Sequence, residues 1–127
     1  MGNFKYNKVV NKVARLSFDL TTISSNAAKI GFNLPADAII TKVVGVIQSA
    51  ITAGTGTTFK LQHSSSTATT WADITANVSV SGLASMFVPA FANSLSAYRL
   101  QGYNEIRLYS DGTFSAGVVD FYIEYYV

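Results

Sequence analysis

Apolar and polar residues alternate one by one along several short segments of this chain. At the C-terminal end, apolar side chains stand at every second position: Val119, Phe121, Ile123, Tyr125 and Val127. A period of two is typical of a β-strand with one buried face, because successive side chains of a strand point to opposite sides. Residues 12–20 and 29–34 show the same alternation. A helix would need a period near 3.6, and no segment of eleven or more residues has that period.

Turn residues separate these segments at intervals that suit an all-β protein. Residues 39–48 are apolar at nearly every position, which predicts a central strand covered on both faces. Further strands are expected around residues 59–63, 78–80 and 106–109. The sequence therefore predicts a single domain of seven or eight strands, arranged as an antiparallel β-sandwich, because each apolar strand face must be covered. A jelly-roll topology is the first choice, and an immunoglobulin-like sandwich is the second.

The composition narrows the classes of function. Charged residues make up only 13% of the chain, there is no cysteine, and His63 is the single histidine. These counts exclude a disulfide framework, a thiolate metal site and a multi-histidine site within one chain, so we expect no metal and no cofactor. A net charge of +2 gives no reason to expect direct binding to nucleic acid. The most apolar stretch, residues 39–51, is too short to cross a membrane.

Candidate catalytic groups are sparse, and we expect no catalytic residues and no enzymatic activity. His63 is followed by three serines, but a serine triad needs a histidine oriented by a carboxylate and a nucleophile on a rigid turn. Asp120 and Glu124 share one face of the last strand, with backbones roughly 13 Å apart, too far for a glycosidase pair. We expect them on the solvent face of that strand, where they could oppose a cation such as Arg107.

Aromatic residues provide the candidate binding sites. If Phe121 and its alternate neighbours face the core, Tyr122 and Tyr126 must face outward. Exposed tyrosines with little charge nearby are favoured at protein interfaces, although ordinary packing on a strand face is the alternative. Trp71 could stack on a sugar ring, which makes a carbohydrate-binding β-sandwich module the alternative function. Packing of Trp71 in the core is the simpler interpretation.

Three segments resemble parts of small jelly-roll proteins of bacteriophage virions. Residues 33–44 (NLPADAIITKVV) are similar to a turn that leads into a long central strand in those proteins. Residues 59–64 (FKLQHS) and 70–74 (TWADI) resemble a pair of their strands, and residues 117–125 (GVVDFYIEY) resemble their closing strand. The resemblance implies a structural subunit without catalytic residues. A capsid auxiliary (decoration) protein is favoured over a head-fibre base or a neck or tail accessory subunit.

The same resemblance implies partners and a location. The partners would be other virion structural proteins, such as major capsid or neck and tail proteins, and further copies of this chain, with a trimer as the expected oligomer. The protein would be made in the host cytoplasm and end in the virion. The resemblance does not extend to the N-terminal residues, and a separate hypothesis makes residues 1–11 an N-terminal arm ahead of a β-sandwich domain at residues 12–127. We expect that arm to order on a neighbouring subunit through Phe4, Lys5, Tyr6 and Lys8.

Overall fold

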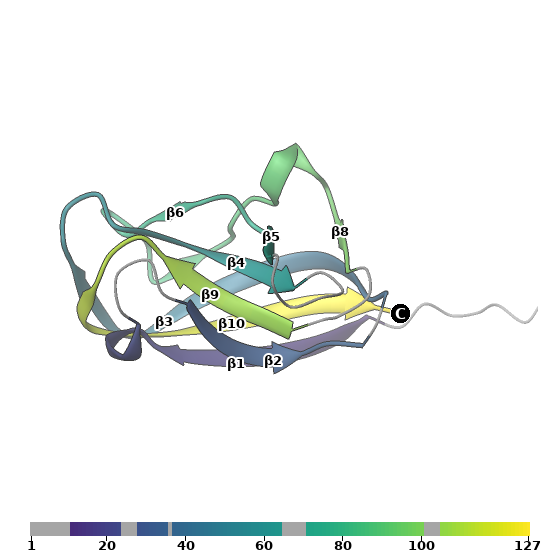
Figure 1. Ribbon diagram of the computed structural model, residues 1–127, viewed down its shortest axis with the longest axis horizontal. Coiled ribbons are helices and arrows are strands. Elements are labelled where there is room, and N and C mark those ends of the chain that lie inside the picture. Colours follow the sequence, from purple (N-terminus) through teal and green to yellow (C-terminus); the bar gives the residue numbers. More distant parts are fainter. Residues whose placement is uncertain (1–10, 24–27, 36, 65–70, 101–104) are drawn as a thin grey trace, which may run out of the picture.

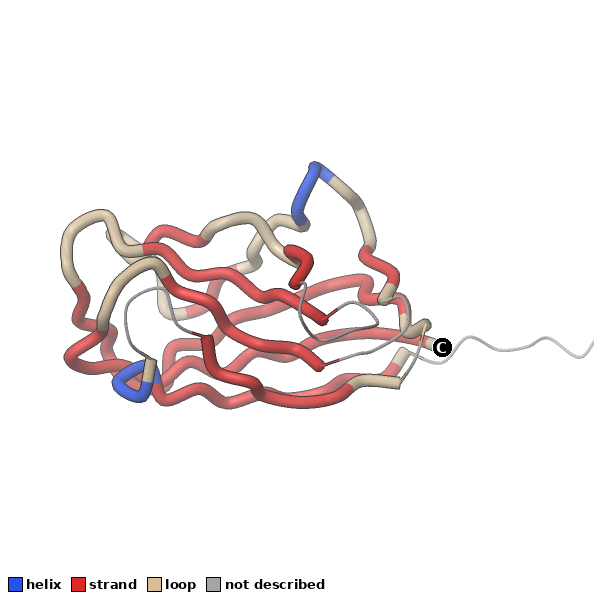
Figure 2. The backbone as a smooth tube through the Cα atoms, viewed as in Figure 1, coloured by secondary structure: helices blue, strands red, loops and turns tan. Residues whose placement is uncertain are grey.

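The computed structural model of this chain describes residues 11–23, 28–35, 37–64, 71–100 and 105–127, and their regular secondary structure is almost entirely β-strand (Figures 1 and 2). The strands are β1 (Lys12–Asp19), β2 (Ala28–Asn33), β3 (Ile39–Ala53), β4 (Thr58–Ser64), β5 (Trp71–Asp73), β6 (Val78–Ser79), β7 (Met86–Phe87), β8 (Tyr98–Arg99), β9 (Glu105–Ser110) and β10 (Phe114–Tyr126). Two single 3-10 turns, η1 (Leu20–Thr22) and η2 (Ala92–Ser94), complete the described elements. The predicted all-β class is confirmed.

The strands form two antiparallel sheets, which we call sheet A and sheet B. Sheet A has the order β1-β10-β3-β7, with β8 also paired to β3, and sheet B has the order β2-β9-β4-β5, with β6 also paired to β4. The short strands β5 and β6 both pair with β4, and β7 and β8 both pair with β3, so each of these two pairs fills one strand position in its sheet. The ten described strands therefore fill eight strand positions, which agrees with the predicted seven or eight strands.

The pairing pattern shows how the chain is wound. The first half pairs with the second half in reverse order, because β1 pairs with β10, β2 with β9, β3 with β7 and β8, and β4 with β5 and β6. Rolling this long antiparallel ribbon adds the contacts of β10 with β3 and of β9 with β4. Two sheets of four strand positions each, wound in this way, form a jelly roll, which is the preferred predicted topology.

The core lies between the two sheets. Phe18, Phe59 and Phe121 are buried there, and the rings of Phe18 and Phe59 each meet the Phe121 ring edge-on at centroid distances of 6.0 and 6.1 Å. These residues come from the predicted alternating segments, so the inward positions were correctly expected. Gly45 of β3 lets the Phe87 ring lie directly against the strand backbone.

One prediction about β3 is wrong. The strand is central in its sheet, but it is not covered on both faces. Ile40 and Val43 are buried, whereas Val44 and Val46 are only half-buried and Lys42 is exposed. The reason is that sheet B covers one side of sheet A, and no other described element covers the opposite side. The apolar run of β3 therefore supplies half of its side chains to the core and half to an outer surface.

Candidate interaction surfaces

The outer side of sheet A carries a band of apolar side chains, which we call the apolar face. In the strand register Tyr122 lies between Arg15 and Val44, and Val46 lies between Asp120 and Met86. Val13, Met86 and Val88 are the most exposed members, at 58%, 64% and 61%. The apolar members of the face are Val13, Val44, Val46, Met86, Val88, Val118 and Tyr122. An antiparallel sheet that faces water usually alternates apolar inside with polar outside, so this band indicates an interaction surface.

An ion pair lies within the apolar face. The carboxylate of Asp120 is fully buried, and it accepts hydrogen bonds from Nε and Nη2 of Arg15 at 3.0 and 2.7 Å. The Arg15 side chain itself remains 61% exposed. Asp120 lies on the outer side of its strand as predicted, but the suggested partner Arg107 is wrong, because Arg107 belongs to β9 of the other sheet. Sheet pairing instead brings β1, far away in sequence, next to β10.

The surroundings of Asp120 keep its carboxylate charged. Burial acts to raise its pKa, but the polar groups of Ser17, Arg15 and Gln48 and the charge of Arg15 together outweigh burial and leave the pKa below its ordinary value. Both hydrogen bonds from Arg15 are made to Oδ2, and Oδ1 has no hydrogen-bond partner among the described residues. A buried charge is tolerated only when it is paired and hydrogen-bonded. The ion pair therefore fixes Arg15 in place while leaving most of its side chain at the surface.

The remaining charges on this face balance one another. Glu124 of β10 lies directly opposite Lys42 of β3 in the register, one row beyond Tyr122. Further along the outer side of sheet A, Asp19 lies opposite Val118 and Arg99 lies opposite Ile39. The outward strand positions thus hold three cations, Arg15, Lys42 and Arg99, and three anions, Asp19, Asp120 and Glu124, so their charges sum to zero.

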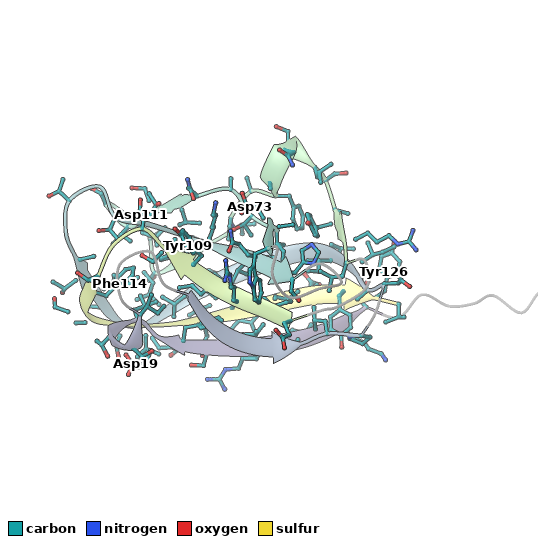
Figure 3. All side chains as sticks on the ribbon, in the orientation of Figure 1. Asp19, Asp73, Tyr109, Asp111, Phe114 and Tyr126 are labelled. Carbon is teal, nitrogen blue, oxygen red and sulfur yellow. The ribbon has the colours of Figure 1, made fainter. Side chains whose placement is uncertain are left out.

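The outer side of sheet B is different, because its polar side chains bind one another. The Lys60 ammonium lies 3.1 Å from the Asp73 carboxylate, and the Gln62 amide donates to the same carboxylate at 2.8 Å. Nε of Arg107 donates to the Gln62 carbonyl oxygen at 2.8 Å. We call this chain of contacts the polar network. Figure 3 labels Asp73 and Tyr109 on this side of the molecule, beside β4 and β9.

Trp71 belongs to the edge of the polar network and not to the core. It is half-buried, and the guanidinium of Arg107 lies over its ring, 3.9 Å from the centroid. Partial burial lowers the pKa of Arg107 from its ordinary value, with the Tyr109 contribution opposing that change. One side of the indole is therefore occupied by a cation–π contact, and a stacked sugar would have to use the other side.

His63 is buried at the end of β4 and points toward the core side of sheet B. Its Nδ1 lies 3.1 Å from the Ser64 carbonyl oxygen, which can only accept, so Nδ1 carries the proton. Its Nε2 then accepts from the hydroxyl of Tyr98 at 2.7 Å. Burial, and secondarily the charge of Asp73, raises the pKa of Tyr98, which keeps that hydroxyl protonated. The arrangement ties β8 to β4 and packs the two rings at 5.1 Å between centroids.

The described residues hold no group of three or more potential metal ligands, and none of their helices has the length and apolarity to cross a membrane. Two hollows of about 310 Å³ lie beside the end of β3, and neither is lined by an ionisable side chain. Their lining residues are Ile47, Ala50, Ile51, Thr52, Ala53, Gly54, Thr55, Gly56, Val80, Ser81, Leu83 and Ser85.

The predicted interface residues separate into two groups. Tyr122 lies within the apolar face, and Tyr126 lies at its end near the C-terminus, where Figure 3 labels it. The residues of the predicted arm, Phe4, Lys5, Tyr6 and Lys8, fall outside the described residues. Sequence reasoning missed Val44, Val46 and Met86. The nearly continuous apolar run of β3 is a usable signal, but by itself it predicts burial on both sides.

Neither the known protein-family models nor the curated proteins give a match to this sequence. Solved structures do match. A chain in the capsid structure of Ralstonia phage GP4 is 10% identical, with a TM-score of 0.68 over 92% of this chain and 84% of that chain. A chain in the acid-stable capsid of Helicobacter pylori bacteriophage KHP30 is 11% identical, with a TM-score of 0.64 over 93% and 88%. A chain in the capsid of cyanophage Pam1 is 21% identical, with a TM-score of 0.62 over 92% and 84%. This chain therefore has a fold that is also found in the capsids of three phages.

Proposed function

We propose that this protein is a non-enzymatic structural subunit of a phage virion. We assign it to the auxiliary, or decoration, type of capsid protein, which attaches to the capsid lattice and associates with copies of itself. The shared fold supports the proposal because the likeness to chains of three phage capsids extends over more than nine-tenths of this chain. The sequence resemblance to jelly-roll virion proteins points the same way.

The observation that carries the proposal is the apolar face. A lattice subunit needs a broad surface that is stabilised by contact with its neighbours, and exposed apolar bands of this kind mark such contacts. Val13, Met86 and Val88 each expose more than half of their surface on this side. An enzyme would need a pocket with ionisable groups, whereas the two described hollows are lined by apolar, hydroxyl and glycine residues.

Purified phage particles test this proposal. Particles would be isolated by density-gradient centrifugation from a lysate of a host that carries the encoding phage, and their proteins would be quantified by mass spectrometry. We expect this chain at a fixed ratio to the major capsid protein, and we expect antibody labelling to place it on the capsid shell. Its absence from washed particles would refute a virion role, and labelling confined to the neck or tail would refute the capsid assignment.

A further inference from the structure

The geometry points to the apolar face as the surface through which copies of this chain bind one another. This inference rests on the proposed function, since it names which part of the molecule performs the self-association. It concerns the outer side of sheet A alone, with Tyr122 and Val46 near the centre and Val13 and Met86 toward opposite sides.

Part of the face has residue types that are favoured in protein interfaces. Tyrosine, methionine and arginine are enriched there, and Tyr122, Met86 and Arg15 lie among valines on this face. Arg15 is already held by Asp120 through Nε and Nη2. Because a guanidinium has five N–H donors, further donors remain for acceptors of a partner, and their position is fixed before binding.

The charges on the apolar face favour a second copy of this chain as its binding partner. The cations Arg15, Lys42 and Arg99 of the outward strand positions are balanced by the anions Asp19, Asp120 and Glu124 within one copy, so two such faces meet without net repulsion. A strongly acidic or basic partner would gain no net attraction from this surface. In a dimer with twofold symmetry both subunits contribute the same surface, and a surface that is partly apolar and electrically balanced is compatible with itself.

The opposite side of the sandwich supports the same assignment by contrast. In the polar network, Lys60, Gln62, Asp73 and Arg107 are bonded to one another within the chain. Covering that side would remove water from charged groups without new partners, which is costly. The apolar face gains from being covered, so the two sides of the sandwich are suited to different surroundings.

The test uses the full chain and substitutions at exposed positions. Met86→Glu combined with Val88→Glu places two carboxylates on the apolar face without disturbing the core, because both side chains are more than 60% exposed. Val13→Glu probes the β1 side of the same face. Leu95→Glu is the matched control, since Leu95 is 48% exposed but lies after η2 and outside sheet A. Size-exclusion chromatography with light scattering gives the mass of each variant, and circular dichroism and thermal melting report its folding.

We expect the unmodified chain and Leu95→Glu to form the same oligomer. The two face variants should be folded and should associate at least about 100-fold more weakly, because they bring like charges together in a dry contact. An unmodified chain that stays monomeric at all concentrations would overturn the inference, as would face variants with the mass of the unmodified oligomer.

Incorporation into particles separates this inference from the proposed function. Each variant would be introduced into the phage, and its amount in purified particles would be compared with that of the unmodified chain. If the face variants keep the oligomer but no longer enter particles, the apolar face binds the capsid instead, and the self-association inference fails while the virion role stands. If even the unmodified chain is missing from particles, the proposed function fails, whatever the oligomer measurements show.

Discussion

Replacing Gly45 by alanine should destabilise the fold, and the structure shows why. A Cβ atom at this position would lie 2.2 Å from Cζ of Phe87 and within 2.6 Å of both Cε atoms. Carbon atoms normally approach to about 3.5–4.0 Å, so the ring or the strand must move by more than about 1 Å. The Phe87 ring cannot easily retreat, because it packs against Phe59 and Phe121 with centroids 6.0 Å away in both cases.

The magnitude follows from the crowding. Adding one methyl group to a well-packed core usually costs about 1–3 kcal/mol, and the short Gly45 contact places this case near 3 kcal/mol. For a chain of this size, roughly 4 °C of melting temperature corresponds to each kcal/mol, so the melting temperature should fall by about 10 °C. Removing the ring in Phe87→Ala should itself cost about 3 kcal/mol, near the low end for Phe→Ala because Phe87 is only half-buried.

The double variant provides the decisive comparison. Once Phe87 is alanine, a methyl group at Gly45 has room, and Gly→Ala should then stabilise the protein by about 0.5–1 kcal/mol, because alanine restricts the unfolded chain. Urea unfolding of the four proteins gives the coupling energy directly, and we expect about 3.5–4 kcal/mol, the difference between the effects of Gly45→Ala in the two backgrounds. Additive effects of the two substitutions, or a neutral Gly45→Ala in the unmodified background, would show that the ring does not occupy this space.

Three further predictions concern charge, the indole and the arm. The pKa of Asp120 is lowered in the folded state, so its contribution to stability is present above its unfolded pKa, about 3.9, and is lost as pH falls through the folded value. Between pH 7 and pH 2 the melting temperature should therefore fall less for Asp120→Asn than for the unmodified chain. An equal fall of the melting temperature in both proteins would contradict this. If the carbohydrate-binding alternative is correct, the unmodified chain should bind on a glycan array, and Trp71→Ala should abolish that binding with little change in melting temperature. If Trp71 only packs on Arg107, neither protein should give a signal on the array. Deletion of residues 1–11 should leave a folded domain by circular dichroism that no longer assembles into particles, and equal incorporation of the truncated chain would disprove a role for the arm.

Local patterns in the sequence were enough to predict the strands and the direction of many side chains. The alternation around Phe121 placed that residue in the core and Tyr122 on the outside, as the structure shows. Alternation is readable in this way because a strand turns successive side chains to opposite sides whatever its neighbours are. The same argument gave two sheets, since each strand with one apolar face needs a cover.

Only the tertiary structure decided which strands lie side by side and which surfaces stay uncovered. Asp120 pairs with Arg15, 105 positions away, and this partner follows from β1 lying beside β10 when the ribbon is rolled. The apolar run of β3 is equally compatible with burial on both sides and with an uncovered outer face, because hydrophobicity alone does not say what lies beyond a sheet. Periodicity is a property of one strand, whereas the apolar face and the polar network require several strands from distant parts of the chain to meet.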